Sequence, residues 1–243
     1  MPEQLPLTEL LNHAFGGAVT AALEAIGIHP KYPAAPITNP VAMQLLVVVV
    51  LTLVFIMIRT RLSVEQPGGL QHVAEFIHGF FSDLGHEIIG HEYKAFVPYL
   101  TTIGLFILSC NLIGLVPGFE SPTATPAVPL GCALCTFIYY NFHGVRTHGF
   151  SYIKQFMGPV LALSPLLLVI EIVSHLARVL SLTVRLFANM FAGEMVTLAF
   201  FSLIPVAVPV IFMGLHIGVA LIQTYIFVLL TAVYLGGAVG HEH

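Results

Sequence analysis

The chain has 243 residues, of which 57% are apolar and 8% are charged. That charged fraction is about a third of the ~25% found in soluble domains, so the composition predicts a polytopic membrane protein. The net charge of −4 is small and the sequence contains no basic run, which argues against a nucleic-acid partner.

The N-terminal stretch MPEQLPLTEL lacks the basic region and apolar core of a secretory signal. It also lacks the arginine-rich, acid-poor composition of an organelle transit peptide. We therefore expect a location in a bacterial inner membrane, with residues 1–40 forming an external segment ahead of the first span.

Uncharged runs of about 20 residues, long enough for a helix to cross a bilayer, divide the remaining chain. They predict an all-α integral membrane protein, a single domain over residues 1–243. About five membrane-spanning helices are expected, at 41–58, 95–119, 121–145, 160–200 and 205–238. The last two are separated near Pro205 and Pro209, because proline interrupts a helix interior.

Residues 65–91, between the first two spans, predict an amphipathic helix at the membrane interface. Apolar side chains recur there every three or four residues, whereas His72, Glu75 and Asp83 fall on another face.

Three other classes of function have weaker support. A metalloprotease needs H-E-x-x-H, but His86 and His91 are five residues apart, about 140° around a helix, so no metal site is expected. Cys132 and Cys135 stand without a second such pair, which favours helix packing over a metal or redox role. No internal repeat of the kind common in secondary transporters is present.

Basic residues predict the orientation of the chain. Placing the 59–61 connection inside also places Lys94, Arg146 and Lys154 inside, and leaves only Lys31 outside. The N-terminus is then external and the C-terminal HEH is cytoplasmic.

The fourth span carries a polar stripe. At about 100° per residue, Glu171, Arg178, Arg185 and Asn189 fall within about 40° of one another. Ser174, His175 and Ser181 widen the stripe. A charge in the middle of a bilayer costs ~2.5–3.5 kcal/mol on insertion scales, so such a stripe indicates either an ion path or an internal salt bridge between helices.

Arg185 has no acidic residue three or four positions away, so we expect its counter-charge to come from another helix or another protein. Arginine stays protonated and can act only as a fixed charge, whereas Glu194 and His216 can exchange protons. If the last helix runs antiparallel to the fourth, one register sets Arg185 level with Gln223 and Glu194 level with His216. Two polar half-paths on either side of a fixed charge are therefore predicted.

Three stretches resemble the family of subunit a of F-type ATP synthases: SLTVRLFANMFAGE, GLHIGVALIQTYIFVLLTAVYL and NLIGLVPGFESPTATP. The resemblance runs from Val41 to the C-terminus. It implies a non-catalytic, cofactor-free stator subunit whose two offset half-channels couple proton flow to c-ring rotation and ATP synthesis. It also implies that the last two helices form a long, tilted hairpin against the c-ring, and that the partners are the c-ring, subunit b, the rest of the F1F0 complex and membrane lipid.

The resemblance also implies roles for single residues. Arg185 would be the essential arginine facing the c-ring carboxylate, with Asn189 and Gln223 as its polar neighbours. Glu194 and His216 would line the external half-channel, and Glu171, Ser174 and Ser181 the internal one, with His175 on the same stripe.

Two features stay open in this comparison. An acidic residue frequent in the family is replaced by Gly114. Arg178 could contact only lipid headgroups or c-ring loops. The coupling ion is expected to be H⁺ rather than Na⁺.

Overall fold

The computed structural model describes residues 4–27, 29, 32–63, 67–116, 118–149, 164–203 and 207–240. Within these residues every regular element is a helix, which confirms the predicted all-α class. The α-helices are α1 (Pro6–Ala25), α2 (Asn39–Thr60), α3 (Gly69–Ile89), α4 (Val97–Ile113), α5 (Ala127–His148), α7 (Ser164–Leu203) and α8 (Ala207–Val239), with short 3₁₀ turns η1 (Tyr93–Ala95) and η2 (Pro122–Ala124). Helices α2, α7 and α8 are long and apolar enough to cross a membrane.

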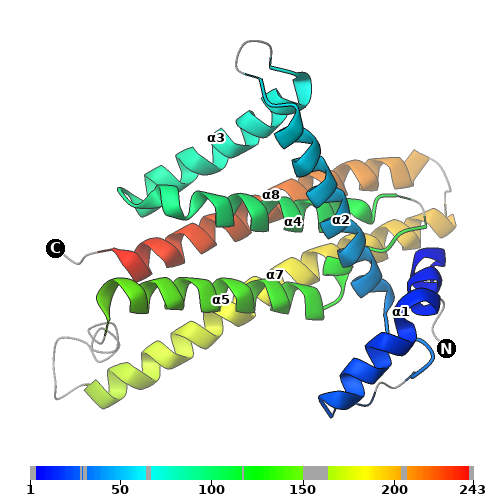
Figure 1. Ribbon diagram of the computed structural model, residues 1–243, viewed down its shortest axis with the longest axis horizontal. Coiled ribbons are helices and arrows are strands. Elements are labelled where there is room, and N and C mark those ends of the chain that lie inside the picture. Colours follow the sequence, from blue (N-terminus) through cyan, green and yellow to red (C-terminus); the bar gives the residue numbers. More distant parts are fainter. Residues whose placement is uncertain are drawn as a thin grey trace.

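Helices α4, α5, α7 and α8 run lengthwise beside one another, and α7 and α8 form an antiparallel hairpin (Figure 1). Helix α2 crosses this group steeply, and α1 lies beside the start of α2. Helix α3 packs against α4 and α8. The two ends of the chain lie at opposite ends of the molecule in this view.

The hydrophobic core lies where α4, α5, α7 and α8 meet. Its most deeply buried side chains include Leu100, Ile107, Tyr140, Leu186, Met190, Phe227 and Leu235. Helix α3 approaches this core closely through Gly104 and Gly236. A Cβ on Gly236 would lie 3.0 Å from the carbonyl oxygen of Ile88, so glycine is what allows the two backbones to touch.

The length of the hairpin helices determines how they can sit in a bilayer. Helix α7 has 40 residues and α8 has 33, which correspond to about 60 and 50 Å. The hydrocarbon core is only about 30 Å thick, so helices with apolar stretches of this length must be strongly tilted. This result agrees with the tilt expected for the last two helices.

Several boundaries differ from those predicted. The second span was expected to reach residue 119, but α4 ends at Ile113 and gives way to a turn in which Gly118 has φ +88°. The third begins at Ala127 rather than 121, because residues 122–124 form η2. Residues 1–40 contain α1, which no pattern had indicated. The residues that α1 buries are Thr8, Asn12 and Gly16, so no stripe of large apolar side chains marks its packed face.

Helix α3 is amphipathic as predicted, but its apolar face is divided. Phe81 and Leu84 are buried against the bundle, whereas Phe76 stays 76% exposed. Since α3 belongs to a membrane protein, the exposed part is the part available to lipid.

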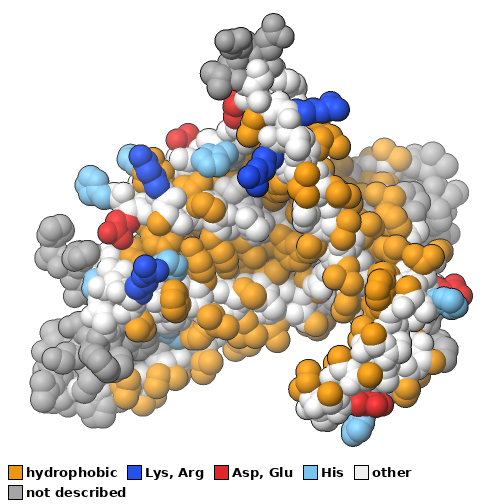
Figure 2. Space-filling model, viewed as in Figure 1, with side chains coloured by type: hydrophobic (Ala, Val, Ile, Leu, Met, Phe, Trp, Pro, Cys, Tyr) orange, Lys and Arg blue, Asp and Glu red, His pale blue; other side chains and the backbone are white. Residues whose placement is uncertain are grey.

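Charged side chains are unevenly distributed over the surface. In the view of Figure 2, lysine and arginine side chains gather around the upper and left parts, and the middle is a broad apolar band. The described residues of α1 and of the α1–α2 connection include no lysine or arginine. Lys31, Lys154, Pro205 and the C-terminal HEH lie outside the described residues.

Candidate functional site

The pairing of α7 with α8 determines which of the predicted polar residues lie opposite one another. Asn189 with Gln223, Arg178 with Tyr234, and Phe200 with Phe212 are contacting pairs, and in each pair the residue numbers add to 412. The predicted register used sums of 408 to 410. The hairpin is therefore displaced by two to four residues from the predicted register, between half a helical turn and one turn, and Gln223 lies opposite Asn189 rather than Arg185.

Arg185 lies half-buried on α7, where its Nη2 donates a hydrogen bond of 3.4 Å to Ser181 Oγ. Within the described residues, no carboxylate lies within ion-pair distance of its guanidinium. This agrees with the absence of a local acidic partner in the sequence. A guanidinium on a membrane helix without a counter-charge in its own chain is unfavourable unless another molecule or water supplies one.

Asn189 and Gln223 form a direct bridge between the hairpin helices. Asn189 Nδ2 donates to Gln223 Oε1 at 2.7 Å. Gln223 is only 3% exposed, whereas Asn189 is exposed. Because Asn189 is one turn from Arg185, this pair fixes α8 at the level of the guanidinium.

A second polar cluster lies nearer the start of α7. His175 Nδ1 is 3.3 Å from Glu171 Oε1 and 3.0 Å from the Glu171 carbonyl oxygen. Arg178 Nη2 lies 3.9 Å from the same carboxylate oxygen, and its guanidinium carbon is 5.1 Å from the centre of the Tyr234 ring. Arg178 therefore contacts α8 inside the bundle, rather than only the headgroups or ring loops considered above. Ser174 is half-buried on the same stretch of α7.

Tyr140 of α5 borders this cluster. Its ring centre lies 5.9 Å from both His175 and Tyr234. Its hydroxyl is buried and has no hydrogen-bond partner among the described residues. Two tyrosines thus join the predicted glutamate and histidine, and neither was selected from sequence because aromatic residues on apolar helices usually serve packing.

Glu194 points away from the Arg185 side of α7, toward the connection between α4 and α5. Its Oε1 accepts a hydrogen bond of 2.9 Å from the backbone N–H of Ser121. A Cβ on Gly114 would lie 3.1 Å from this oxygen and 2.8 Å from Ser121 Cβ. The Glu194 carboxylate and the Ser121 backbone therefore occupy the space that a side chain at position 114 would need.

A buried hydrogen-bond network extends from this contact toward α8. Ser121 Oγ is 3.0 Å from the Cys110 carbonyl oxygen and 2.8 Å from Thr123 Oγ1, which is 2.7 Å from Asn111 Oδ1. Asn111 Nδ2 reaches Thr224 Oγ1 at 3.5 Å. The four side chains are at most 5% exposed.

Two of the three hydroxyl groups in this network, those of Ser121 and Thr123, have fewer hydrogens than contacts. Ser121 and Thr123 supply one hydroxyl hydrogen each, but three oxygen–oxygen contacts compete for them. The hydroxyls can therefore exchange donor and acceptor roles, as a proton relay requires. Sequence reasoning missed these residues. The available signal was polar side chains inside uncharged runs, such as Asn111.

The ring of His216 on α8 packs against α7 at Gly193, a position without a side chain. A Cβ on Gly193 would lie 2.6 Å from His216 Nδ1. His216 is 6% exposed, and its Nε2 is buried without a hydrogen-bond partner in the described part of the chain. Since Gly193 precedes Glu194, His216 lies next to the turn of α7 that carries the glutamate, as the predicted register required.

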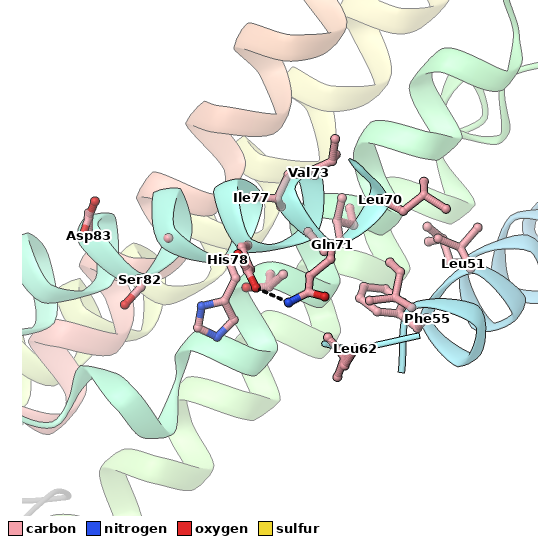
Figure 3. A pocket seen from close by; sticks show the side chains of 17 residues that line it. Leu51, Phe55, Leu62, Leu70, Gln71, Val73, Ile77, His78, Ser82 and Asp83 are labelled. Carbon is pink, nitrogen blue, oxygen red and sulfur yellow. Dashed lines mark hydrogen bonds between the residues drawn. The ribbon is translucent and has the colours of Figure 1, made fainter. Parts of the chain in front are cut away.

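A cavity of about 490 Å³ lies between α2, α3 and α4, where Leu51 and Phe55 face Leu70 and Gln71 (Figure 3). Its lining is mainly apolar, and it is separate from the polar residues of the hairpin. Within the described residues, no three His, Cys, Asp or Glu side chains are grouped so as to hold a metal ion.

Residues 41–236 match the family described as ATP synthase A chain. The chain is 57% identical to ATP synthase subunit a of Koribacter versatilis over 244 residues, which cover all of both proteins. It is 49% identical to ATP synthase subunit a of Solibacter usitatus, over 96% of this chain and all of the relative. It is 41% identical to ATP synthase subunit a of Geotalea uraniireducens, over 81% of this chain and 86% of the relative.

Proposed function

Because this chain belongs to the ATP synthase A chain family, we propose that it is the stationary subunit that carries protons through the membrane sector of an F-type ATP synthase. The subunit itself catalyses no covalent chemistry. Its role is to offer two proton half-paths that open on opposite sides and are separated by the charge of Arg185.

The observation that supports this proposal is the environment of the Arg185 side chain. It is half-buried on a membrane helix, within reach of the surface, and without an ion-pair partner in the described part of its own chain. A carboxylate on a neighbouring rotating ring would supply the missing counter-charge. Arginine cannot release its proton, so it would also block direct passage between the half-paths.

The external half-path comprises Glu194 and His216, together with the network of Asn111, Ser121, Thr123 and Thr224. Glutamate and histidine can each take up and release a proton, and the buried hydroxyls supply switchable hydrogen bonds between helices. The single N–H contact from Ser121 leaves Glu194 further acceptor capacity for water or a proton donor.

The internal half-path comprises Glu171, Ser174, His175 and Ser181. The carboxylate of Glu171 lies between the His175 imidazole and the Arg178 guanidinium, which stabilise its charge and hold it in place. Tyr140 and Tyr234 enclose this group. Asn189 and Gln223 connect the two helices beside Arg185, between the half-paths.

The exposed apolar surfaces of α7, α8 and α2 are available for the c-ring, subunit b and lipid. The basic residues near the ends of α2, α3 and α5 favour a cytoplasmic position for that side and an external N-terminus. A bacterial inner membrane is the corresponding location, and H⁺ the coupling ion.

The test is Arg185→Ala in the complete complex reconstituted into liposomes. ATP-driven proton pumping should be lost while the catalytic head still hydrolyses ATP. The matched control is Arg61→Ala, which removes an exposed arginine beyond the end of α2 and should leave pumping intact. Near-normal pumping by Arg185→Ala would overturn the proposal.

A further inference from the structure

The connection between α4 and α5 carries an acidic residue, Glu120, that the half-paths above do not include. It is exposed, and the 3₁₀ turn η2 that follows it in this connection packs against α7 and α2. Glu120 directly precedes Ser121 in the chain, and the backbone N–H of Ser121 donates a hydrogen bond of 2.9 Å to Glu194 Oε1.

This linkage determines how far apart the two carboxylates can be. A glutamate side chain reaches only a few ångströms from its backbone, so the carboxylates of Glu120 and Glu194 are at most about 10 Å apart. A row of up to three water molecules, at about 2.8 Å per hydrogen bond, can bridge such a gap.

A partner on α2 holds Glu120 in place. Asn39 Nδ2 donates to Glu120 Oε1 at 3.4 Å, and Asn39 Oδ1 accepts the Leu5 N–H at 3.2 Å. Because a backbone N–H can only donate, the contact with Leu5 orients the amide so that its NH₂ group faces Glu120. The segment that precedes α1 therefore helps to position an acidic residue of the α4–α5 connection.

The local charges suit a collector of cations. The described residues of α1 and of the α4–α5 connection include no lysine or arginine, whereas the one basic residue of the α1–α2 connection, Lys31, lies outside the described residues. The titratable side chains of α1 are Glu9, His13 and Glu24, and within the described residues none of them forms a hydrogen bond or ion pair with Glu120. Position 114, nearer the network, is closed to an acid because Glu194 and Ser121 fill it.

We propose that Glu120 is the outer proton-collecting residue of the external half-path: its carboxylate takes a proton from external water and passes it through bridging water to the Glu194 carboxylate. Glu120 returns to the ionised form after each transfer, so no other reactant is needed. This inference rests on the proposed function.

The experiment measures passive proton conduction in liposomes that contain the complete membrane sector without its catalytic head. A collecting carboxylate matters most when free protons are scarce, because capture then limits the flux. Glu120→Gln should therefore slow conduction about three- to tenfold at an outer pH of about 8.5, and have little effect at about pH 6. Glu120→Asp keeps the carboxylate and should restore most of the alkaline flux.

The control is Glu9→Gln, which removes an exposed acid of α1. It should leave conduction unchanged at both pH values. The inference is overturned if Glu120→Gln conducts like the unmodified protein, if it slows conduction equally at both pH values, or if Glu9→Gln has the same effect.

Glu194→Gln in the same assay separates this inference from the proposed function. If Glu194→Gln slows conduction but Glu120→Gln does not, only Glu120 is removed from the path. If neither variant slows conduction, the external half-path itself is wrong.

Discussion

Replacing Gly193 by alanine should displace His216 and slow proton conduction without unfolding the hairpin. The added methyl group would lie 2.6 Å from His216 Nδ1 and 3.1 Å from its Cε1. Non-bonded contacts of carbon are not found at 2.6 Å. Restoring a separation of about 3.0–3.4 Å needs a shift of about 0.4–0.8 Å in the ring or in the spacing of α7 and α8.

The energetic cost of this shift is partly offset. Overpacking a well-packed site typically costs ~1–3 kcal/mol, whereas alanine is ~1 kcal/mol more favourable than glycine within a helix. The net destabilisation is thus about 0–2 kcal/mol, too little to unfold two helices of this length. A displacement of this size can nevertheless slow a transfer that depends on geometry by about tenfold or more.

Passive proton conduction through the reconstituted membrane sector measures this effect. Gly131→Ala is the matched control, because a Cβ on Gly131 of α5 meets no atom within 4 Å. We expect the control to conduct normally and Gly193→Ala to conduct about tenfold more slowly, with both complexes equally assembled. Normal conduction by Gly193→Ala would show that the position of His216 does not limit the flux, and the reasoning from this contact would be wrong.

Three further experiments test the packing of the helices. Thr123→Val leaves the Asn111 side-chain oxygen without its 2.7 Å donor. Thermal denaturation of the complex should therefore show a free energy of unfolding that is lower by ~1–3 kcal/mol, and Thr123→Ser should recover most of this loss. A double-mutant cycle with Asn189→Ala and Gln223→Ala, measured on the free energy of unfolding of the complex, should give a coupling free energy of ~0.5–1.5 kcal/mol. Strictly additive effects of the two substitutions would contradict a direct hydrogen bond. Gly104→Ala places a Cβ 2.6 Å from a phenylalanine ring of α3 and should therefore lower the unfolding temperature of the complex. An unchanged unfolding temperature would mean that α3 is not packed this closely.

The sequence predicted the polar stripe well because helical periodicity alone groups its members. Glu171 and Arg178 are seven residues apart, and the structure brings them within 3.9 Å. At about 100° per residue, Glu194 lies about 180° around the helix from Arg185, and its contact with Ser121 agrees with this position. The roles assigned to these residues in proton transfer stay predictions.

The register of the hairpin was predicted less well, since it depends on the turn and on side-chain volumes. Proline predicted a break near residue 205, and the described helices end at Leu203 and resume at Ala207. The contact of Asn189 with Gln223 instead reflects packing along the whole hairpin. A difference of one turn decides which polar side chain faces Gln223.

Hydropathy and helical periodicity were sufficient to determine the class of this protein, its long apolar helices and the face of α7 that carries charge. These properties are local, because they depend on residues within a few turns of one another. Only the tertiary structure decided that Ser121, on a loop, provides an N–H for Glu194 on α7, and that Asn111 and Thr224 extend this contact across two more helices. Such contacts join residues up to 113 positions apart, and no periodic pattern specifies them because they depend on how the helices pack.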